Sequence, residues 1–176
     1  MNITVYLGSA AGNRAVFRQA AQELGAWIGR SGHTLIYGGS DVGLMGVLAD
    51  AVLAANGRVI GVEPRFFVEE EIQHSGITEL IITETMSERK QKMIELGDVF
   101  VAFPGGIGTL EEISEVMVLS KIQRIEQPFC FLNIDGYYEP LRELLRHMAR
   151  EGFLEDDWLQ SVRFVDSVAD VATLII

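Results

Sequence analysis

The sequence predicts an α/β fold with a doubly wound, mostly parallel sheet of the Rossmann-like type, formed by a single domain over residues 1–176. Two observations predict this fold class. Short, continuous apolar runs alternate with longer segments of helical periodicity, as in parallel sheets that are covered by helices on both faces. Glycine-rich turns follow three of the apolar runs, and right-handed crossovers place such turns at the edge of the sheet where ligands bind.

The first part of the chain begins with an apolar run and then alternates regularly. Its first helical segment carries apolar residues at helical spacing, namely Phe17, Ala21, Leu24 and Ile28. The second helical segment stops at Asn56-Gly57, a typical C-terminal signal. We therefore expect a strand at 3–7, a helix at 14–30, a strand at 34–37, a helix at 44–55 and a strand at 59–62.

The second part of the chain opens with residues 66–76, which are polar, acidic and without clear periodicity, so an irregular connection is expected there. The alternation then resumes, and no linker or internal repeat divides the chain. We expect strands at 80–83, 99–103, 129–133 and 163–165, and helices at 87–96, 109–123, 138–151 and from residue 168 onward.

The composition excludes several classes of function. The formal net charge of −11 disfavours binding to polymeric nucleic acid or to an anionic membrane by bulk attraction, although a local pocket can still accept a small phosphate ligand. The single cysteine, Cys130, cannot form an intrachain disulfide, and its apolar neighbours predict a buried strand residue. The first residues resemble a strand rather than a signal peptide, and no apolar stretch is long enough to span a membrane. We therefore expect a cytoplasmic protein.

The most informative segment is residues 104–112, which read PGGIGTLEE and follow an apolar run. Glycines let the backbone approach a ligand, and the start of the next helix favours an anion. An acid, Glu111, stands where a G-x-G-x-x-G turn would have its third glycine. A carboxylate at this place is useful if the neighbouring sugar becomes cationic during the reaction. The competing interpretation is structural, because Thr109 and Glu112 also match a capping box, whose two side chains would only cap the start of a helix.

A second candidate is Arg89 in residues 86–93, MSERKQKM. On a helix, Arg89 shares a face with Met86 and Met93, so it lies within an apolar stripe. Either its side chain extends to water from the edge of the stripe, or its planar guanidinium binds an anionic partner such as a phosphate or carboxylate. We favour the second interpretation.

Other candidate sites are weaker or absent. Residues 38–46 form a second glycine cluster after a strand, and phosphate binding there competes evenly with a tight turn and close helix packing. Residues 8–12 form a still weaker one. There is no G-x-x-x-x-G-K-[ST] motif and no G-x-S-x-G motif, and the three histidines lack zinc-ligand spacing, so we expect no metal.

The two motifs together resemble the Lonely Guy family of cytokinin riboside 5′-monophosphate phosphoribohydrolases. Residues 104–112 fit its P-G-G-x-G-T-x-x-E signature, and residues 86–93 fit its M-x-x-R-K-x-x-M signature. The resemblance extends to residues 6–9, 37–46 and 132–138. It implies a Rossmann-like dimer without a redox cofactor that splits the N-glycosidic bond between an adenine-type base and ribose 5-phosphate. Some members were labelled lysine decarboxylases, which the three lysines of this chain do not support.

The resemblance also assigns residues. It implies that Arg89 and Glu112 are the catalytic pair and that further residues contact the nucleotide, namely Glu71, Lys90, Gly105, Gly106, Gly108, Thr109 and Glu111. From the two other glycine turns and the arginine helix we add Ser9, Gly39, Gly43, Gly46 and Met86 as candidate substrate contacts. Ile107 replaces the tyrosine that many members carry, which leaves the preferred base open.

The predicted function is therefore hydrolysis of a purine nucleoside 5′-monophosphate, with no cofactor. In this hypothesis the phosphate binds backbone N–H groups of residues 105–109. Glu112 stabilises an oxocarbenium-like ribose or activates water. The alternative is a non-catalytic carrier of a nucleotide or pterin cofactor; an NAD-dependent oxidoreductase is disfavoured by the acid at position 111. A homodimer is expected, with a twofold contact formed by apolar residues of two helices, namely Met93, Ile94, Met117, Val118 and Ile122.

Overall fold

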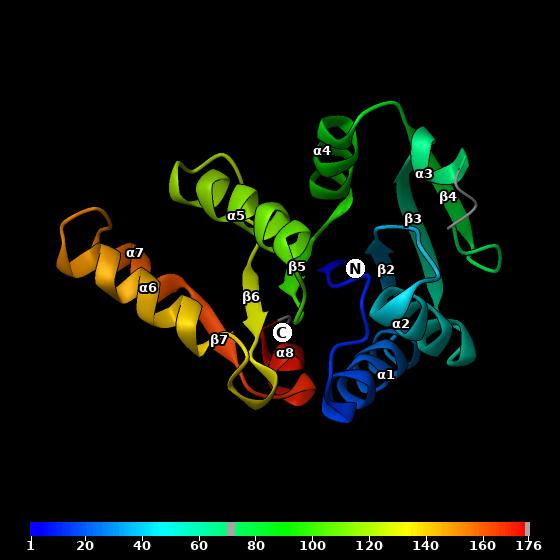
Figure 1. Cartoon of the computed structure of the whole chain (residues 1–176), viewed down its shortest axis with the longest axis horizontal. Helices are drawn as coiled ribbons and strands as arrows, with labels where there is room; N and C mark the ends of the chain where they lie inside the picture. The colour runs from blue at the N-terminus through cyan, green and yellow to red at the C-terminus, as the bar shows by residue number, and fades with distance from the viewer. Residues whose placement is uncertain (70–72, 175–176) are drawn as a thin grey trace.

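The computed structural model describes residues 1–69 and 73–174. Within these residues, seven strands form one parallel sheet with the order β4-β3-β2-β1-β5-β6-β7 (Figure 1). The strands are β1 (Asn2–Tyr6), β2 (Thr34–Tyr37), β3 (Arg58–Pro64), β4 (Glu79–Thr83), β5 (Val99–Ala102), β6 (Phe129–Leu132) and β7 (Arg163–Val165). The predicted doubly wound, parallel α/β fold is thereby confirmed.

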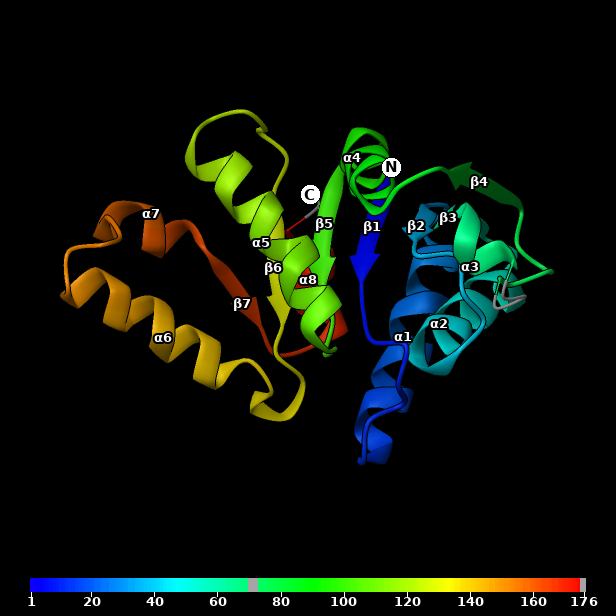
Figure 2. The ribbon, with the colours of Figure 1, turned by 45° about the horizontal axis from the view of Figure 1, so that its top comes forward.

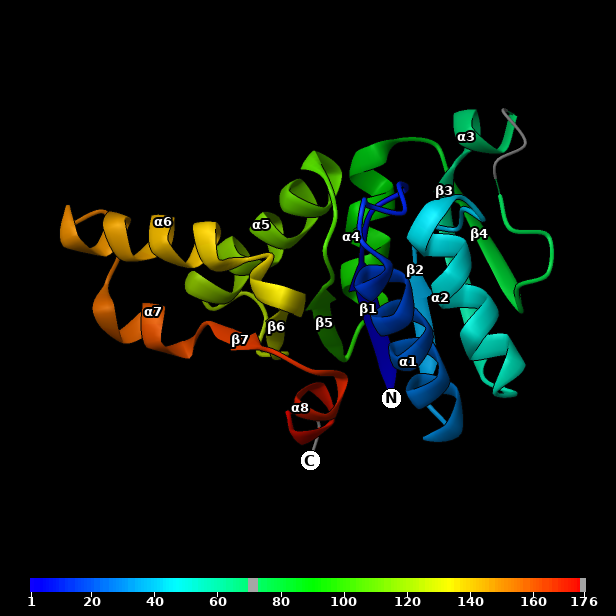
Figure 3. The same cartoon turned by 60° about the horizontal axis from the view of Figure 1, so that its bottom comes forward.

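Helices cover both faces of this sheet. They are α1 (Ala15–Arg30), α2 (Gly43–Ala54), α3 (Arg65–Glu69), α4 (Met86–Leu96), α5 (Ile107–Lys121), the 3-10 helix η1 (Ile134–Gly136), α6 (Glu139–Arg150), α7 (Asp156–Ser161) and α8 (Val168–Thr173). Helices α1, α2 and α8 lie on one side of the sheet, and α4 and α5 lie on the other (Figure 2). Helices α6 and α7 extend outward beyond β7 (Figure 3).

The sheet separates two apolar cores, because successive side chains of a strand point to opposite faces. In β1, Ile3 and Val5 contribute to the core under α1 and α2, whereas Tyr6 contributes to the core under α4 and α5. The central strands β5 and β6 are buried along their whole length, which explains why their sequences are continuously apolar. Cys130 is buried in β6, as predicted.

Most predicted elements are confirmed with bounds within two residues, and the strands at 34–37 and 163–165 agree fully. The prediction of an irregular connection over 66–76 was wrong in part, because α3 lies at its start. The short elements η1 and α7 were missed, since three to six residues carry too little periodicity to be recognised. None of the helices among the described residues is both long enough and apolar enough to cross a membrane.

The expected twofold surface needs one correction. Met93 is fully buried in the core of its own chain and offers no surface to a partner, because α4 turns this residue toward the sheet. Val118 and Ile122 are more than half exposed, at 57% and 55%. The apolar surface that the sequence indicated on the second helix is therefore present, whereas the contribution of Met93 is not.

Candidate active site

The strand order places a ligand crevice between β1 and β5. Successive strands run outward from β1 through β2, β3 and β4, and the order then reverses at β5 on the other side of β1. Ligands of open α/β sheets bind at such a switch point, beyond the carboxyl ends of the strands. The turns after β1 and β5 meet there, and the turn after β2 lies alongside.

A cavity of about 600 Å³ opens at this edge. Of the residues that the sequence indicated, it is lined by Ser9, Met86, Arg89, Gly106, Gly108, Thr109 and Glu112. These residues come from the turn after β1, from α4 and from the start of α5, so the structure brings together segments that are about 100 residues apart in the sequence. Both candidate catalytic residues are among them.

The start of α5 lacks a side-chain cap. Its N-cap residue is Gly106, and the helix begins at Ile107, so Thr109 is already the third helical residue. The capping box that Thr109 and Glu112 could have formed is therefore absent, and that interpretation was wrong. Because the first N–H groups of a helix have no partner within the helix, those of residues 107–109 are available to an anion. The hydroxyl of Thr109 is also buried without a partner among the described residues.

Gly106 and Gly108 have a property that internal packing does not require. A Cβ atom added to either residue would meet no atom within 4 Å. Gly105 differs, since a Cβ there would lie 2.8 Å from the backbone nitrogen of Gly8. Gly105 thus allows the two turns to pack, whereas Gly106 and Gly108 leave space next to the free end of α5. Open space beside the free N–H groups of a helix start allows an anion to bind there.

Arg89 and Glu112 form a buried ion pair in this cavity. The Nη1 atom of Arg89 donates to Oε1 of Glu112 at 2.7 Å, and the two residues are only 8% and 7% exposed. The Nε atom of Arg89 donates to the carbonyl of Val62 at 2.9 Å. Gly38 makes room for the guanidinium, because a Cβ at this position would lie 2.3 Å from Nη2. The prediction that Arg89 has an anionic partner is confirmed.

The electrostatics of this pair suit a reaction in which positive charge develops. Burial raises the pKa of the Glu112 carboxyl, and the field of Arg89 opposes that rise. A carboxylate held by a guanidinium in a site with little water stabilises a nearby cation more strongly than it would in water. The same carboxylate can accept a proton from a bound water molecule.

Lys90 and Glu111 were expected to contact a nucleotide, but they do not line the cavity. Lys90 instead pairs with Glu111 at 2.7 Å and with Glu115 at 3.1 Å, which ties α4 to α5. These pairs raise the pKa of Lys90, the bond to Glu111 contributing most.

The glycines of residues 39–46, which follow β2 and begin α2, have a packing role. Gly39, Gly43 and Gly46 do not line the cavity. Gly43 has a φ of +62°, and a Cβ there would lie 1.9 Å from the carbonyl oxygen of Ser9. A Cβ at Gly46 would lie 2.0 Å from the carbonyl oxygen of Asp41. The remaining candidate, Glu71, lies outside the described residues.

Sequence reasoning missed Glu63. This residue lies near the end of β3, is 1% exposed and lines the same cavity as Arg89 and Glu112. Its Oε2 atom has no hydrogen-bond partner within the described part of the chain. Burial raises its pKa to about 7, against the field of Arg89. A signal was available in the sequence, since Glu63 is a single charged residue that directly continues the apolar run 59–62.

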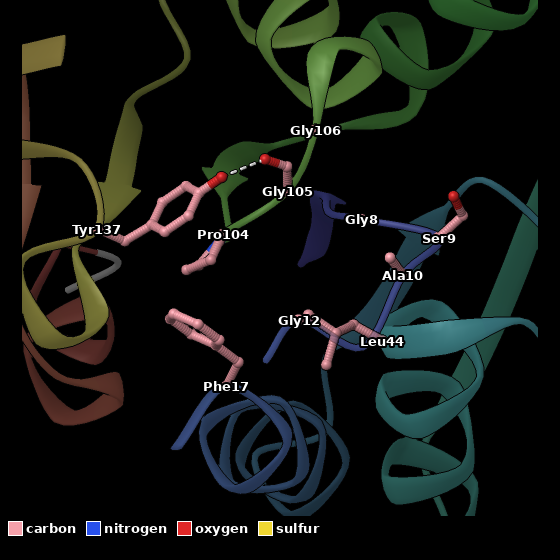
Figure 4. Close-up of a pocket in the computed structure, with 10 residues that line it drawn as sticks. All are labelled: Gly8, Ser9, Ala10, Gly12, Phe17, Leu44, Pro104, Gly105, Gly106 and Tyr137. Atoms are coloured by element: carbon pink, nitrogen blue, oxygen red, sulfur yellow. Dashed lines mark hydrogen bonds between the residues drawn. The ribbon is translucent and has the colours of Figure 1, made fainter. Parts of the chain in front are cut away.

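A second, smaller cavity of about 280 Å³ lies beside the glycine turn (Figure 4). Tyr137 points its hydroxyl toward the turn and donates to the carbonyl of Gly105. The ring of Phe17 packs edge-on against Tyr137, with centroids 5.7 Å apart. The next residue, Tyr138, donates to the carbonyl of Phe103 at 2.7 Å. Two consecutive tyrosines therefore hold the connection from β5 to α5 in place.

Neither a metal site nor a catalytic lysine is evident in the part of the chain that the structure describes. No group of three or more His, Cys, Asp or Glu side chains there is arranged to hold a metal ion. The three lysines of the sequence pair with glutamates, Lys90 as described, Lys92 with Glu95 and Lys121 with Glu155. None of them lines the 600 Å³ cavity, so no lysine is placed to form a Schiff base there.

Comparisons with known proteins agree with this site. A family model described as a possible lysine decarboxylase matches residues 45–175. A probable cytokinin riboside 5′-monophosphate phosphoribohydrolase of Oryza sativa subsp. japonica is 43% identical over 160 residues, covering 91% of this chain and 72% of that protein. The cytokinin riboside 5′-monophosphate phosphoribohydrolase of Rhodococcoides fascians is 44% identical over 154 residues, covering 87% of this chain and 78% of that protein.

Solved structures share the fold. The molybdenum cofactor binding protein of the phototrophic bacterium Rippkaea orientalis superposes with a TM-score of 0.73 at 23% identity, over 99% of this chain and 94% of that chain. At this identity the likeness concerns the fold alone. The family, in contrast, follows from the sequence relatives and from the match to the family model. The chain belongs to the Lonely Guy family of cytokinin riboside 5′-monophosphate phosphoribohydrolases.

Proposed function

We propose that this protein hydrolyses the N-glycosidic bond of a purine nucleoside 5′-monophosphate, with adenine or a cytokinin as the base, and releases the free base and ribose 5-phosphate. The observation that carries the proposal is the buried pair of Arg89 and Glu112, 2.7 Å apart, in the same cavity as the uncapped start of α5. The names of the sequence relatives support the same activity.

In the proposed complex the phosphate binds at the start of α5. The free N–H groups of residues 107–109 and the unpartnered hydroxyl of Thr109 are its donors, and the open space at Gly106 and Gly108 admits it. The turn after β1, with Ser9, forms the opposite wall. Gly105 supports this cradle through its contact with Gly8, and Lys90 and Glu111 act at its rim by tying α4 to α5.

The ribose then lies over Glu112, about one helical turn beyond the phosphate site. As the bond from C1′ to the base breaks, the sugar becomes oxocarbenium-like, and the carboxylate stabilises this charge. Water attacks C1′ and transfers its proton to Glu112. Arg89 holds the carboxylate in position, because its own guanidinium is fixed by the carbonyl of Val62.

Base release tests the proposal. Purified protein is incubated with AMP and with N6-isopentenyl-AMP, and free base is measured by chromatography. Glu112→Gln removes the negative charge with little change in shape, so kcat is expected to fall by about 10² to 10³. The matched control is Glu95→Gln, the same change at a surface residue of α4 that pairs with Lys92. Near-normal turnover in Glu112→Gln would contradict the assigned role.

The carrier function is the competing candidate, and the same experiment separates the two. A carrier would retain the intact nucleotide or pterin ligand through gel filtration and would release no base. The solved molybdenum cofactor binding protein shares only the fold with this chain, so it does not favour that function here. The buried ion pair favours catalysis, since binding alone does not require a carboxylate where a phosphorylated sugar lies.

We also propose that the protein is a cytoplasmic homodimer. Nucleoside monophosphates are made and used inside cells, which supports the location. For the dimer, apolar residues of α5 and α6 line an open groove, among them Met117, Val118, Leu144 and Met148. Val118 and Leu144 are 57% and 47% exposed, and a twofold contact would bury them. Light scattering at micromolar concentration measures this directly, and a monomeric mass would contradict it.

A further inference from the structure

Glu63 is a buried carboxyl group that the reaction as described does not use. Its side chain is almost completely enclosed, yet Oε2 has no hydrogen-bond partner among the described residues. Buried polar atoms are nearly always hydrogen-bonded, since leaving one unpaired is costly. Because Glu63 lines the active-site cavity, the missing partner can be supplied by a ligand.

The position of Glu63 fits the base of a nucleotide bound as proposed above. The proposed phosphate site follows β5, and Glu63 lies on β3, with β1 and β2 between them. Neighbouring strands are about 4.8 Å apart, so roughly 14 Å separate β3 from β5. An extended nucleotide that starts at α5 and passes over Glu112 therefore places its base near β3.

The walls of the cavity outside the phosphate site also suit a base. Val42, Met45 and Phe67 line the cavity and are apolar. They come from the turn before α2, from α2 and from α3, which directly follows β3. A flat, largely apolar ring that packs against such side chains needs few polar contacts, and Glu63 lines the same cavity with a carboxyl group that can make one.

We propose that Glu63 is the general acid of the reaction, donating a proton to a ring nitrogen of the purine as it departs. This inference rests on the function proposed above. The bond between C1′ and N9 breaks, and its electron pair stays with the base. The base takes the proton of Glu63 and leaves as a neutral purine. Water adds to C1′ and gives its proton to Glu112, and exchange with solvent restores both carboxyl groups, so the net reaction consumes one water molecule.

The surroundings of Glu63 keep its proton available at neutral pH. Burial raises its pKa to about 7, Arg89 from α4 lowers it, and Asp41 from the turn after β2 raises it. The charge of Glu63 is also felt by Tyr37 of β2, whose pKa it helps to raise after burial. Arg65 of α3 forms an ion pair with Glu84. An acid of this strength is well matched to proton transfer near pH 7. It is charged in only part of the molecules at that pH.

The test compares two substrates. One is AMP, whose base leaves poorly without a proton, and the other is 4-nitrophenyl ribofuranoside 5-phosphate, whose nitrophenolate leaves unprotonated. Glu63→Gln keeps the shape of the side chain but cannot donate a proton. We expect kcat for AMP to fall by about 10², while turnover of the nitrophenyl substrate stays within about threefold of the wild type. Glu95→Gln is again the matched control.

The pH profile provides a second readout. With AMP, kcat/KM of the wild type should decline above about pH 7, because only protonated Glu63 is active, and this alkaline decline should be absent in Glu63→Gln. Glu63→Asp retains an acid and should retain the decline. Equal losses on both substrates, or full activity of Glu63→Gln with AMP, would overturn the inference. Failure of the wild type to release base from AMP would instead overturn the proposed function itself.

Discussion

Two glycine-rich turns of this molecule follow strands in the same way but have different roles. Where the turn after β2 leads into α2, Gly43 and Gly46 of the first helical turns lie close against backbone atoms of Ser9 and Asp41. Where the turn after β5 leads into α5, Gly106 and Gly108 face open space. The comparison teaches that a glycine can be required for packing or for a ligand, and that an added Cβ distinguishes the two cases. Four substitutions test it.

The largest effect is expected at the packed turn. Gly43→Ala introduces a Cβ that would lie 1.9 Å from the carbonyl oxygen of Ser9, at a residue whose φ is +62°. Neither the backbone oxygen nor the strained φ can adapt cheaply, so the free energy of unfolding should fall by roughly 3 kcal/mol. Urea denaturation followed by circular dichroism measures this. Unchanged stability would show that the turn is looser than the structure indicates.

Arg89 lies between Gly38 of the turn after β2 and Glu112 of α5, and Gly38→Ala tests its position. The added Cβ would lie 2.3 Å from Nη2 of Arg89, the far end of a flexible side chain. We expect the guanidinium to move away from Glu112, so kcat should fall by about 10². Destabilisation should stay near 1 kcal/mol, because the side chain can adapt. A crystal structure of the variant with Arg89 in its original position would contradict this explanation.

A smaller effect, confined to activity, is expected at the open turn. Gly108→Ala adds a methyl group to open space, and alanine is the better helix former, so stability should stay the same or rise by about 0.5 kcal/mol. The methyl group occupies room that the phosphate would use, and KM for AMP should rise by about tenfold, which is 1.4 kcal/mol of binding. If KM is unchanged, the phosphate does not bind beside Gly108.

The smallest effect is expected from Tyr137→Phe. This change removes the hydrogen bond to the carbonyl of Gly105 and keeps the ring against Phe17. Because Tyr137 is 42% exposed, water can replace the lost donor, and we expect a loss of about 0.5–1 kcal/mol in stability. KM for AMP should rise two- to threefold if the bond steadies the turn, by about 0.5 kcal/mol. Thermal unfolding and steady-state kinetics measure both quantities.

Much of the fold could be predicted because its signals are local. The continuous apolar runs at β5 and β6 have no polar side to turn toward water, so only a sheet covered on both faces accommodates them. The apolar periodicity of α1 likewise specified its buried face. The short helices α3 and α7 could not be predicted, since five or six residues do not establish a period.

The candidate site was predictable only in part. The spacing of Arg89 from its neighbouring methionines placed a guanidinium in an apolar stripe, where a buried cation needs an anion. The motif at residues 104–112 indicated an anion site. A local pattern gave a wrong prediction where it fits two structures. Thr109 matches the first residue of a capping box, but α5 begins two residues earlier, at Ile107.

The sequence by itself determined the parallel α/β architecture, the candidate anion site at the start of α5 and the need for a partner at Arg89, because each depends on residues close together in the chain. Only the tertiary structure decided that this partner is Glu112, that Gly43 serves packing while Gly108 does not, and that Glu63 points into the cavity. These properties depend on contacts between segments that the sheet brings together, and no local pattern records which atoms will meet across it.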